Sequence, residues 1–401
     1  MENFTFYAQR PNDSYRKTDA MLIVSILLLW GLGLFTVFFS TSARSEFLFG
    51  NKYRFFVKQI IWSAVGFALM IFMTLFPMNK IRKYVPLVTF ASLFLCLLPF
   101  VPFMSEELKG AHRWISIGPL TFQPSELAKF AMILFLSNYL AKEEESLPGQ
   151  KKSFFVPLMG ILIFSLIVLL QRDFSTAVLF FLVGVILLFV SGARMWWVFP
   201  CLALVIPMGI YFIFGFDYRS SRIQAFFDPE AYSDTSGLQF LRSKNAIASA
   251  GFWGSGLGSG LTLVYKIPEV VNDYIFAGWA SALGFVGVLL YFVVLTFFMI
   301  RAVKIALDCP NVFAAYGTFG CAVFIVLQSL VNCAVVCGVL PTTGIPLPFF
   351  STGGSSLLMT FVMCGFMLNA SHCDEGKDFV SSYEDKNENI ESIGGVVVEY
   401  E

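Results

Sequence analysis

Long apolar stretches separated by short polar segments run along most of the chain. About 20 apolar residues are needed to cross the ~30 Å hydrocarbon layer of a bilayer as a helix. Ten such stretches are present, at residues 20–41, 57–77, 84–103, 122–141, 153–171, 173–192, 196–216, 274–300, 312–340 and 347–370. They do not alternate between apolar and polar positions, as the strands of a membrane barrel would. The pattern therefore predicts an all-α polytopic membrane protein with about ten transmembrane helices.

The composition supports this class. The 401 residues are 57% hydrophobic and only 13% charged, and their mean hydropathy is +0.73. A soluble domain carries roughly 25% charged residues, so a soluble enzyme and a secreted disulfide-rich protein are both excluded. Lysine plus arginine and aspartate plus glutamate number 27 each, so bulk charge does not indicate nucleic-acid binding.

The flanking charges predict an orientation. The first apolar stretch lacks a small-residue cleavage site and is expected to remain as the first membrane span. Ten crossings place both termini on one side, and the distribution of Lys and Arg favours the cytoplasm. Lys52, Arg54 and Lys58 run against this rule, because they fall in the first outer loop.

Three segments stand outside the membrane pattern. Residues 1–19 form a polar, cytoplasmic N-terminal segment, and residues 371–401 form an acidic tail that is expected to be disordered. Residues 217–273 form one large extracytoplasmic loop, which is too long for a simple connection. The loop is rich in aromatic residues, and its glycines at 251–260 predict a tight turn. No Gly-Lys-Ser/Thr follows them, so they are not a nucleotide-binding loop.

Two opposite charges fall inside the fourth span. Pro124 is suited to the first turn of a helix, and Glu126 and Lys129 then lie three residues apart on one face. A charge at this depth costs about 2.5–3.5 kcal/mol on insertion scales, so the two are expected to pair. The pair serves either to hold helices together or as part of a functional site.

Two further candidates lie near the outer surface. Arg113 carries a fork of donors suited to phosphate oxygens, whereas His112 is more typical of an interfacial residue. Asp173 begins the sixth span, where a helix N-terminus favours an acid. Capping alone is a sufficient explanation for Asp173.

Asp273 is the strongest candidate for a catalytic group. It ends the long loop and begins the eighth span, beside Tyr274, Ile275 and Phe276. These neighbours would reduce its solvation, which makes a carboxylate a stronger base. The alternative is that Asp273 caps the helix.

Four separated motifs resemble the SEDS family (shape, elongation, division and sporulation proteins) of the FtsW/RodA type. They are GAHRWISIGPLTFQPSELAKF at 110–130, YRSSRIQAFFDP at 218–229, NDYIFA at 272–277 and LPTTGIPLPFFSTGGSSLL at 340–358. The resemblance spans about residues 20–370. The last motif and the long polar tail favour the division branch over the elongation branch.

The resemblance implies a peptidoglycan glycosyltransferase that polymerises lipid II into β-1,4 glycan at the outer face of the cytoplasmic membrane. It also implies a class B penicillin-binding protein as partner. Asp273 matches the essential loop aspartate of the family, and Arg113, Glu126 and Lys129 match polar residues important for its function. Trp114 and Asp173 are further candidates for contacting the substrate.

The residue types suit that chemistry. Forming a glycosidic bond requires a base that takes the proton of the attacking 4-hydroxyl, a role we assign to Asp273. The departing pyrophosphate requires positive charge, which Arg113 and Lys129 could supply. A divalent cation, Mg²⁺ or Mn²⁺, could serve instead.

The sequence departs from the family at several positions. Relatives usually carry an acidic pair where Ser281 and Ala282 stand, Pro and Gly in place of Arg172 and Ser175, and Tyr in place of Thr352. Two other functions stay open: a flippase for the lipid-linked precursor, for which a charged pair inside the membrane is suited, and a non-catalytic scaffold that recruits cell-wall synthases. A scaffold would keep its function without Asp273.

Overall fold

The computed structural model describes residues 18–101, 113–117, 120–146, 155–192, 217–232, 237–259, 267 and 270–372. These residues are mostly helical. One small sheet pairs β1 (Ile115–Ile117) with β2 (Leu120–Phe122) in antiparallel register. The helices are α1 (Ala20–Phe49), α2 (Arg54–Leu75), α3 (Met78–Leu97), α4 (Pro124–Ser146), α5 (Phe155–Leu170), α6 (Phe174–Val190), α8 (Asp217–Phe227), α9 (Gly237–Ala250), α10 (Gly256–Ser259), α12 (Ile275–Asp308), α13 (Val312–Val336) and α14 (Gly354–Ser371).

These helices confirm the all-α membrane class. In the described part of the chain, nine helices fall on nine of the ten predicted spans, and the remaining one, 196–216, lies outside it. Helices α1, α2, α3, α12, α13 and α14 are each long and apolar enough to cross a membrane, and α5 and α6 are shorter apolar helices. The predicted terminal segments 1–19 and 371–401 lie almost wholly outside the described residues.

Local start signals set where several helices begin. Asp19 precedes α1 and its side chain accepts a hydrogen bond from the amide of Leu22, 2.7 Å away. Asn311 caps α13 in the same way through the amide of Ala314, at 3.1 Å. Pro124 opens α4, as its fixed φ and missing N–H favour. These caps satisfy backbone donors that the first helical turn leaves without partners.

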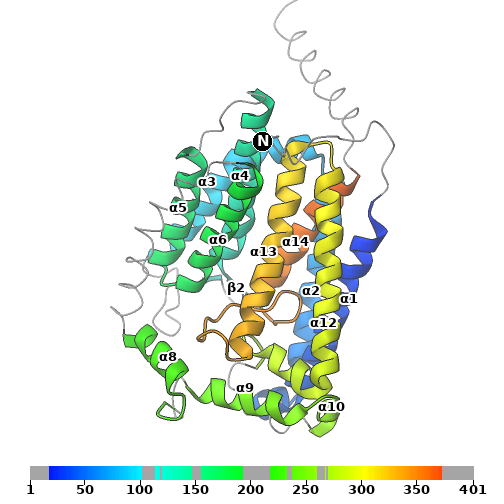
Figure 1. Ribbon diagram of the computed structural model, residues 1–401, viewed down its shortest axis with the longest axis vertical. Helices are drawn as coiled ribbons and strands as arrows, with labels where there is room; N and C mark the ends of the chain where they lie inside the picture. Colours follow the sequence, from blue (N-terminus) through cyan, green and yellow to red (C-terminus); the bar gives the residue numbers. More distant parts are fainter. Residues whose placement is uncertain are drawn as a thin grey trace, which may run out of the picture.

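The bundle is organised around α13 and α14, the two most buried of the six long apolar helices. Helices α3, α4, α5 and α6 lie on one side of α13, and α1, α2 and α12 lie on the other (Figure 1). Helix α13 contacts α4, α6, α12 and α14, while α2 packs along α14. Most of α2 and α3 faces outward and presents large apolar side chains, as expected for helices that face lipid.

The predicted extracytoplasmic loop is folded rather than extended. Its helices α8, α9 and α10 lie across one end of the bundle (Figure 1). Helix α9 packs on α12 and α13, and the Ser243 hydroxyl donates to the carbonyl of Val336 at 3.0 Å. The predicted glycine turn is confirmed at Gly251, Gly254 and Gly256, which all have positive φ.

The glycine turn is hydrogen-bonded to α12 at a break in that helix. Gly284 interrupts that helix with φ 61° and ψ −153°, a conformation open almost only to glycine. The freed backbone groups bond to the turn: the amide of Phe285 donates to Gly251 at 3.2 Å, and the amide of Ser255 donates to Ser281 at 3.0 Å. The loop therefore replaces hydrogen bonds that the broken helix loses.

Gly284→Ala is expected to destabilise the protein by at least about 1–3 kcal/mol, the range for a residue forced into such a conformation. A Cβ at this position would also lie 2.3 Å from the amide nitrogen of Gly254. Gly31→Ala is the matched control, because a Cβ on that helical glycine meets nothing within 4 Å. Thermal unfolding of the two variants measures the difference, and equal unfolding temperatures would contradict the role given to the break.

The tenth predicted span starts later than expected. We predicted helix from residue 347, but α14 begins at Gly354, and residues 337–353 form a non-helical segment. Part of this segment is buried: Leu347, Phe349 and Phe350 are each at most 2% exposed. Non-helical backbone at membrane depth requires partners within the protein. The amide of Gln59 lies 3.5 Å from the Phe349 carbonyl and supplies one of them.

Candidate active site

One cavity of about 550 Å³ brings all the predicted site residues together. Its wall includes Arg113, Trp114, Glu126, Lys129, Asp173 and Asp273. These residues are up to 160 positions apart and come from the entry to β1, from α4, from the start of α6 and from the turn before α12. His112 lies outside the described residues. The sequence motifs therefore converge on one place.

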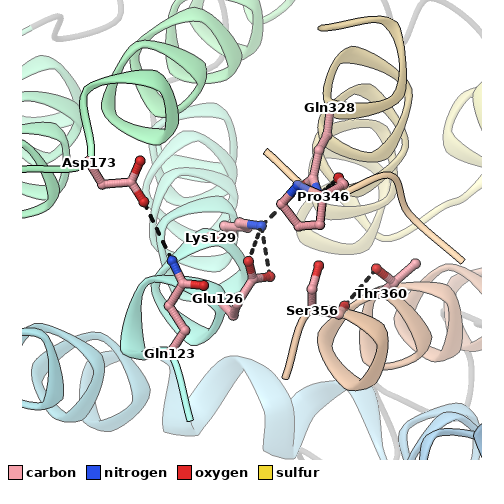
Figure 2. A network of polar contacts seen from close by, with 8 residues as sticks. All are labelled: Gln123, Glu126, Lys129, Asp173, Gln328, Pro346, Ser356 and Thr360. Atoms are coloured by element: carbon pink, nitrogen blue, oxygen red, sulfur yellow. Dashed lines mark hydrogen bonds and ion pairs between the residues drawn. The ribbon is translucent and has the colours of Figure 1, made fainter. Parts of the chain in front are cut away.

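The predicted pair between Glu126 and Lys129 is confirmed and is fully buried. The Lys129 ammonium lies 2.7 Å from both carboxylate oxygens of Glu126 (Figure 2). Both side chains are 3% exposed. A third donor of Lys129 reaches the side-chain oxygen of Gln328 at 3.0 Å. Since an ammonium has three donors, all are engaged, and Lys129 can bond a substrate only by exchanging a partner.

Gln328 links this pair to the segment before α14. Its amide nitrogen donates to the carbonyl of Pro346 at 2.8 Å, while its oxygen accepts from Lys129 (Figure 2). The Lys129 ammonium also lies 5.4 Å from the centre of the Phe324 ring, within range of a cation–π contact. The pair thus holds α4, α13 and the segment at 341–353 in one arrangement.

Arg113 and Asp173 form a second polar group. The Asp173 carboxylate caps α6 by accepting from the amide of Thr176 at 3.4 Å, so the capping interpretation is confirmed. It also lies 3.8 Å from an Arg113 nitrogen and 3.4 Å from the amide of Gln123. Arg113 donates in addition to the carbonyl of Arg172. Its Nε is buried without a partner among the described residues, while the Arg113 side chain lines the cavity and belongs to a residue type suited to phosphate oxygens.

Asp273 lies in the turn immediately before α12. The structure gives the cap position of that helix to Tyr274, without a side-chain hydrogen bond, so Asp273 is not the helix cap. Tyr274, Ile275 and Phe276 are buried in the core, whereas Asp273 is half-buried and lines the cavity. A Cβ on Gly344 would lie 3.5 Å from the Asp273 carboxylate, an ordinary contact distance, so this glycine lies directly beside the acid.

The sequence analysis missed Asn332, which positions the backbone around Asp273. Its amide nitrogen donates at 2.8 Å to the carbonyl of Asp273 and at 2.8 Å to that of Ile345. Asn332 is 1% exposed and follows Gln328 by one helical turn on α13. Two amides at this spacing in an apolar span were the available signal, because intramembrane polar residues are costly and tend to be functional.

Asn332→Leu is expected to lower both stability and activity. The change leaves two buried carbonyls without a donor, and each unsatisfied group costs about 1–3 kcal/mol. The control is Ser329→Ala on the same helix, since the Ser329 hydroxyl donates to the carbonyl of Ile325 within α13 and not to the turn before α12. Thermal unfolding and the polymerisation assay described below measure the two effects. An Asn332→Leu variant that matches Ser329→Ala in both would contradict a positioning role.

Other cavity residues also escaped the sequence analysis. Trp62 lines the wall together with the predicted Trp114, and large aromatic rings supply apolar contact area with a polar edge. Arg222 belongs to the motif at 218–229 and lines the same cavity. It donates at 3.0 Å to the carbonyl of Thr342, which ties α8 to the segment before α14.

The helix ends add positive potential to the cavity. First-turn residues of three helices line it: Glu126 of α4, Thr176 of α6 and Ser355 of α14. A helix N-terminus carries about half a positive charge and points free N–H groups outward. Together with the arginines, these ends make the cavity suited to an anionic ligand.

The described residues include no group of three or more His, Cys, Asp or Glu side chains that could by itself hold a metal ion. Mg²⁺ commonly uses only one or two carboxylates and completes its shell with substrate phosphates and water. The carboxylate of Asp273, which lines this cavity, fits that mode of binding.

Comparison with known proteins gives consistent matches. Residues 20–376 match the family of FtsW, RodA and SpoVE, described as cell cycle proteins. A probable peptidoglycan glycosyltransferase FtsW from Thioalkalivibrio sp. is 34% identical over 353 residues, covering 87% of this chain and 88% of the relative. The stage V sporulation protein E of Bacillus subtilis is 31% identical over 362 residues, covering 88% and 96%.

Solved structures agree with the fold. A chain from a peptidoglycan synthase complex that coordinates polymerisation and crosslinking has a TM-score of 0.72 and 27% identity, covering 88% of this chain and 97% of that chain. The rod shape determining protein RodA of Thermus thermophilus has a TM-score of 0.65 and 24% identity, covering 90% and 98%. At that identity, the likeness to RodA supports the fold alone.

Proposed function

This chain belongs to the FtsW/RodA/SpoVE family of cell cycle proteins, and we propose that it is a peptidoglycan glycosyltransferase that polymerises lipid II. Relatives at 31–34% identity carry the same activity in their names. The activity serves cell division or elongation, and the acidic tail and the last motif favour division.

The observation that carries the proposal is that Asp273 and two arginines line the same cavity. Asp273 is half-buried in the wall that also holds Arg113 and Arg222. The substrate has a hydroxyl to deprotonate and a pyrophosphate to stabilise, so a base and cations are needed within one site. This cavity supplies both.

The reaction assigns each group a task. The Asp273 carboxylate takes the proton from the 4-hydroxyl of the acceptor sugar, and the resulting oxygen attacks the anomeric carbon of the donor. The bond from that carbon to the pyrophosphate oxygen breaks, and the pyrophosphate leaves with the electron pair. Attack from the opposite face inverts the anomeric centre, as in base-assisted inverting hydrolysis.

The leaving pyrophosphate is assigned to the cationic side of the cavity. Arg113 has a donor with no partner among the described residues and is the first candidate to bind a phosphate oxygen. Lys129 contributes through the arrangement that its bonds to Glu126 and Gln328 maintain. A divalent cation, Mg²⁺ or Mn²⁺, would be held by Asp273 and would neutralise the pyrophosphate. Trp114 is assigned to a sugar ring of the substrate.

The cytoplasmic membrane is the proposed location, with both termini in the cytoplasm and the cavity open to the outer face. The two ends of the described chain lie together: the amide of Asp19 donates to the Ser371 hydroxyl at 3.1 Å, and Arg301 pairs with the Asp19 carboxylate. The excess of Lys and Arg on that side supports a cytoplasmic placement. The loop helices α8, α9 and α10 then face the compartment where lipid II is displayed.

A class B penicillin-binding protein is the proposed partner. The support is the similarity to a chain of a synthase complex that coordinates polymerisation and crosslinking. The two activities are complementary, because the glycan made by one is the substrate crosslinked by the other.

The test is reconstitution of the purified chain, alone and with a class B penicillin-binding protein, on fluorescently labelled lipid II. We expect a ladder of glycan products on a gel. A preparation that binds lipid II and yet forms no glycan under either condition would favour the flippase or the scaffold.

A further inference from the structure

The hairpin between α1 and α2 carries four basic residues at the proposed outer face, against the usual excess of Lys and Arg on the cytoplasmic side. Two of them have local explanations. Lys52 lies 3.6 Å from the carboxylate of Glu46, with both side chains exposed, and the Arg54 guanidinium lies 4.0 Å above the ring of Phe49. The other two basic residues of the hairpin are Arg44 and Lys58.

Arg44 and Lys58 line a second cavity of about 320 Å³. Arg44 is half-buried near the end of α1, and Lys58 lies in the second turn of α2. No acidic side chain is among the described residues that line this cavity, and Leu48 and Phe55 form its apolar part. Two cations around a small cavity without an acid are suited to an anion with several oxygens.

The second cavity adjoins the active site. Lys58, Asn272 and Thr352 line both cavities and form the wall between them. The wall is braced by the Thr352 hydroxyl, which lies 3.1 Å from the side-chain oxygen of Asn272 and 3.1 Å from the carbonyl of Val271. Asp273 follows Asn272 directly, so the second cavity begins one residue from the proposed base.

We propose that the second cavity binds the pyrophosphate of the acceptor substrate through Arg44 and Lys58. The inference rests on the proposed function, in which two lipid-linked substrates meet. The donor pyrophosphate is attached to the reacting carbon and must lie in the cavity of Asp273. The acceptor reacts at the far end of its disaccharide, so its pyrophosphate lies about two sugar rings from the base and requires an anion site of its own.

The surroundings suit a lipid-linked anion better than a free one. Leu48 and Phe55 give the cavity an apolar side. Just below Lys58, α2 exposes Val57, Ile60 and Ile61, each at least 42%. A polyprenyl chain could follow this apolar face into the bilayer while its headgroup stays with the two cations.

Counting bound substrate tests the proposal without relying on turnover. Asp273→Asn protein, which is expected not to consume lipid II, is saturated with lipid II and weighed by native mass spectrometry. We expect two lipid II molecules per chain, and one after Arg44→Ala and Lys58→Ala are added. Lys52→Ala, a basic residue of the same hairpin that lines neither cavity, should keep two.

The outcomes distinguish the second pyrophosphate site from the proposed glycosyltransferase function. Two molecules bound after loss of both cations, or one molecule bound before it, would overturn the second site while leaving the proposed function intact. No binding to any variant would overturn the proposed function and this inference together. Arg44→Lys with Lys58→Arg should retain two molecules, and this variant separates loss of charge from loss of folding.

A substrate lacking the pentapeptide distinguishes the pyrophosphate from the peptide carboxylates. We expect the same change from two molecules to one with this substrate. If only the complete lipid II responds to Arg44 and Lys58, the cavity binds the peptide and the proposal is wrong. In the active protein, the same two alanine substitutions should raise the KM for lipid II roughly tenfold or more, as expected for loss of a charged hydrogen bond.

Discussion

Asp273→Asn is expected to lower the rate of glycan formation by roughly 100- to 10,000-fold, the contribution typical of a general base. Asparagine has nearly the same shape as aspartate, but its neutral amide cannot take the proton of the attacking hydroxyl. The bond from Asn332 goes to the backbone carbonyl of Asp273 and is unaffected by the change. The initial rate of ladder formation from labelled lipid II is the measurement.

Asp228→Asn is the matched control for this prediction. Asp228 belongs to the same large loop and is exposed, and its side chain accepts a hydrogen bond from the nearby amide of Ala231, at 3.2 Å. It should polymerise at the rate of the unmodified protein. Both variants should unfold at the same temperature as that protein. Polymerisation by Asp273→Asn at a rate within a few-fold of the control would falsify the base assignment and favour a scaffold.

Lys129→Ala is expected to destabilise the protein by about 3–5 kcal/mol, the range for removing one partner of a buried ion pair. The Glu126 carboxylate would lose its cation at a position where it is only 3% exposed. Gln328 would lose a donor as well. The unfolding temperature in detergent and the amount of protein inserted in the membrane should both fall.

A double change separates the structural role of the pair from its part in the reaction. Glu126→Gln combined with Lys129→Met removes both charges and keeps similar volumes, and such replacements are often neutral for stability. We expect the double variant to regain most of the lost stability and to remain slow in polymerisation. If Lys129→Ala alone unfolds like the unmodified protein, the pair is not a structural element of the core.

Features set by neighbouring residues could be predicted from the sequence. Pro124 marks the start of α4, Asp173 caps α6, and Glu126 meets Lys129 because three residues on a helix bring two side chains together. Each depends on positions less than one turn apart. The nine helices that fall on predicted spans in the described part of the chain follow from the length of the apolar stretches alone.

Features set by distant partners could not be predicted. The pattern of apolar residues after 347 predicted a helix, but they form a buried turn. Gln59 of α2 donates to the backbone of this turn, and Asn332 of α13 donates to Ile345 just before it. The break at Gly284 likewise depends on amides and carbonyls from a turn 30 residues earlier. Apolar content gives no information on either, since it does not show which backbone groups will meet.

The residues of the cavity could be predicted from the sequence only in part. Arg113, Lys129 and Asp273 could be identified from the sequence as charged residues in or next to apolar spans, where a charge costs free energy. Their convergence on one cavity depends on how α4, α6 and α12 pack. Asn332 and Trp62 escaped notice because an amide and an indole in an apolar stretch resemble ordinary packing residues. Only their contacts with the turn before α12 and with α14 give them a role.

The break in α12 has a mechanical consequence for the base. Residues 275–283 form a short stub of helix whose far end is joined to the external turn by main-chain bonds, and whose near end carries Asp273. Peptide groups rather than adjustable side chains connect the turn and the stub. A force applied to the outer loop would therefore reach the turn that carries Asp273 through main-chain bonds and a helical stub.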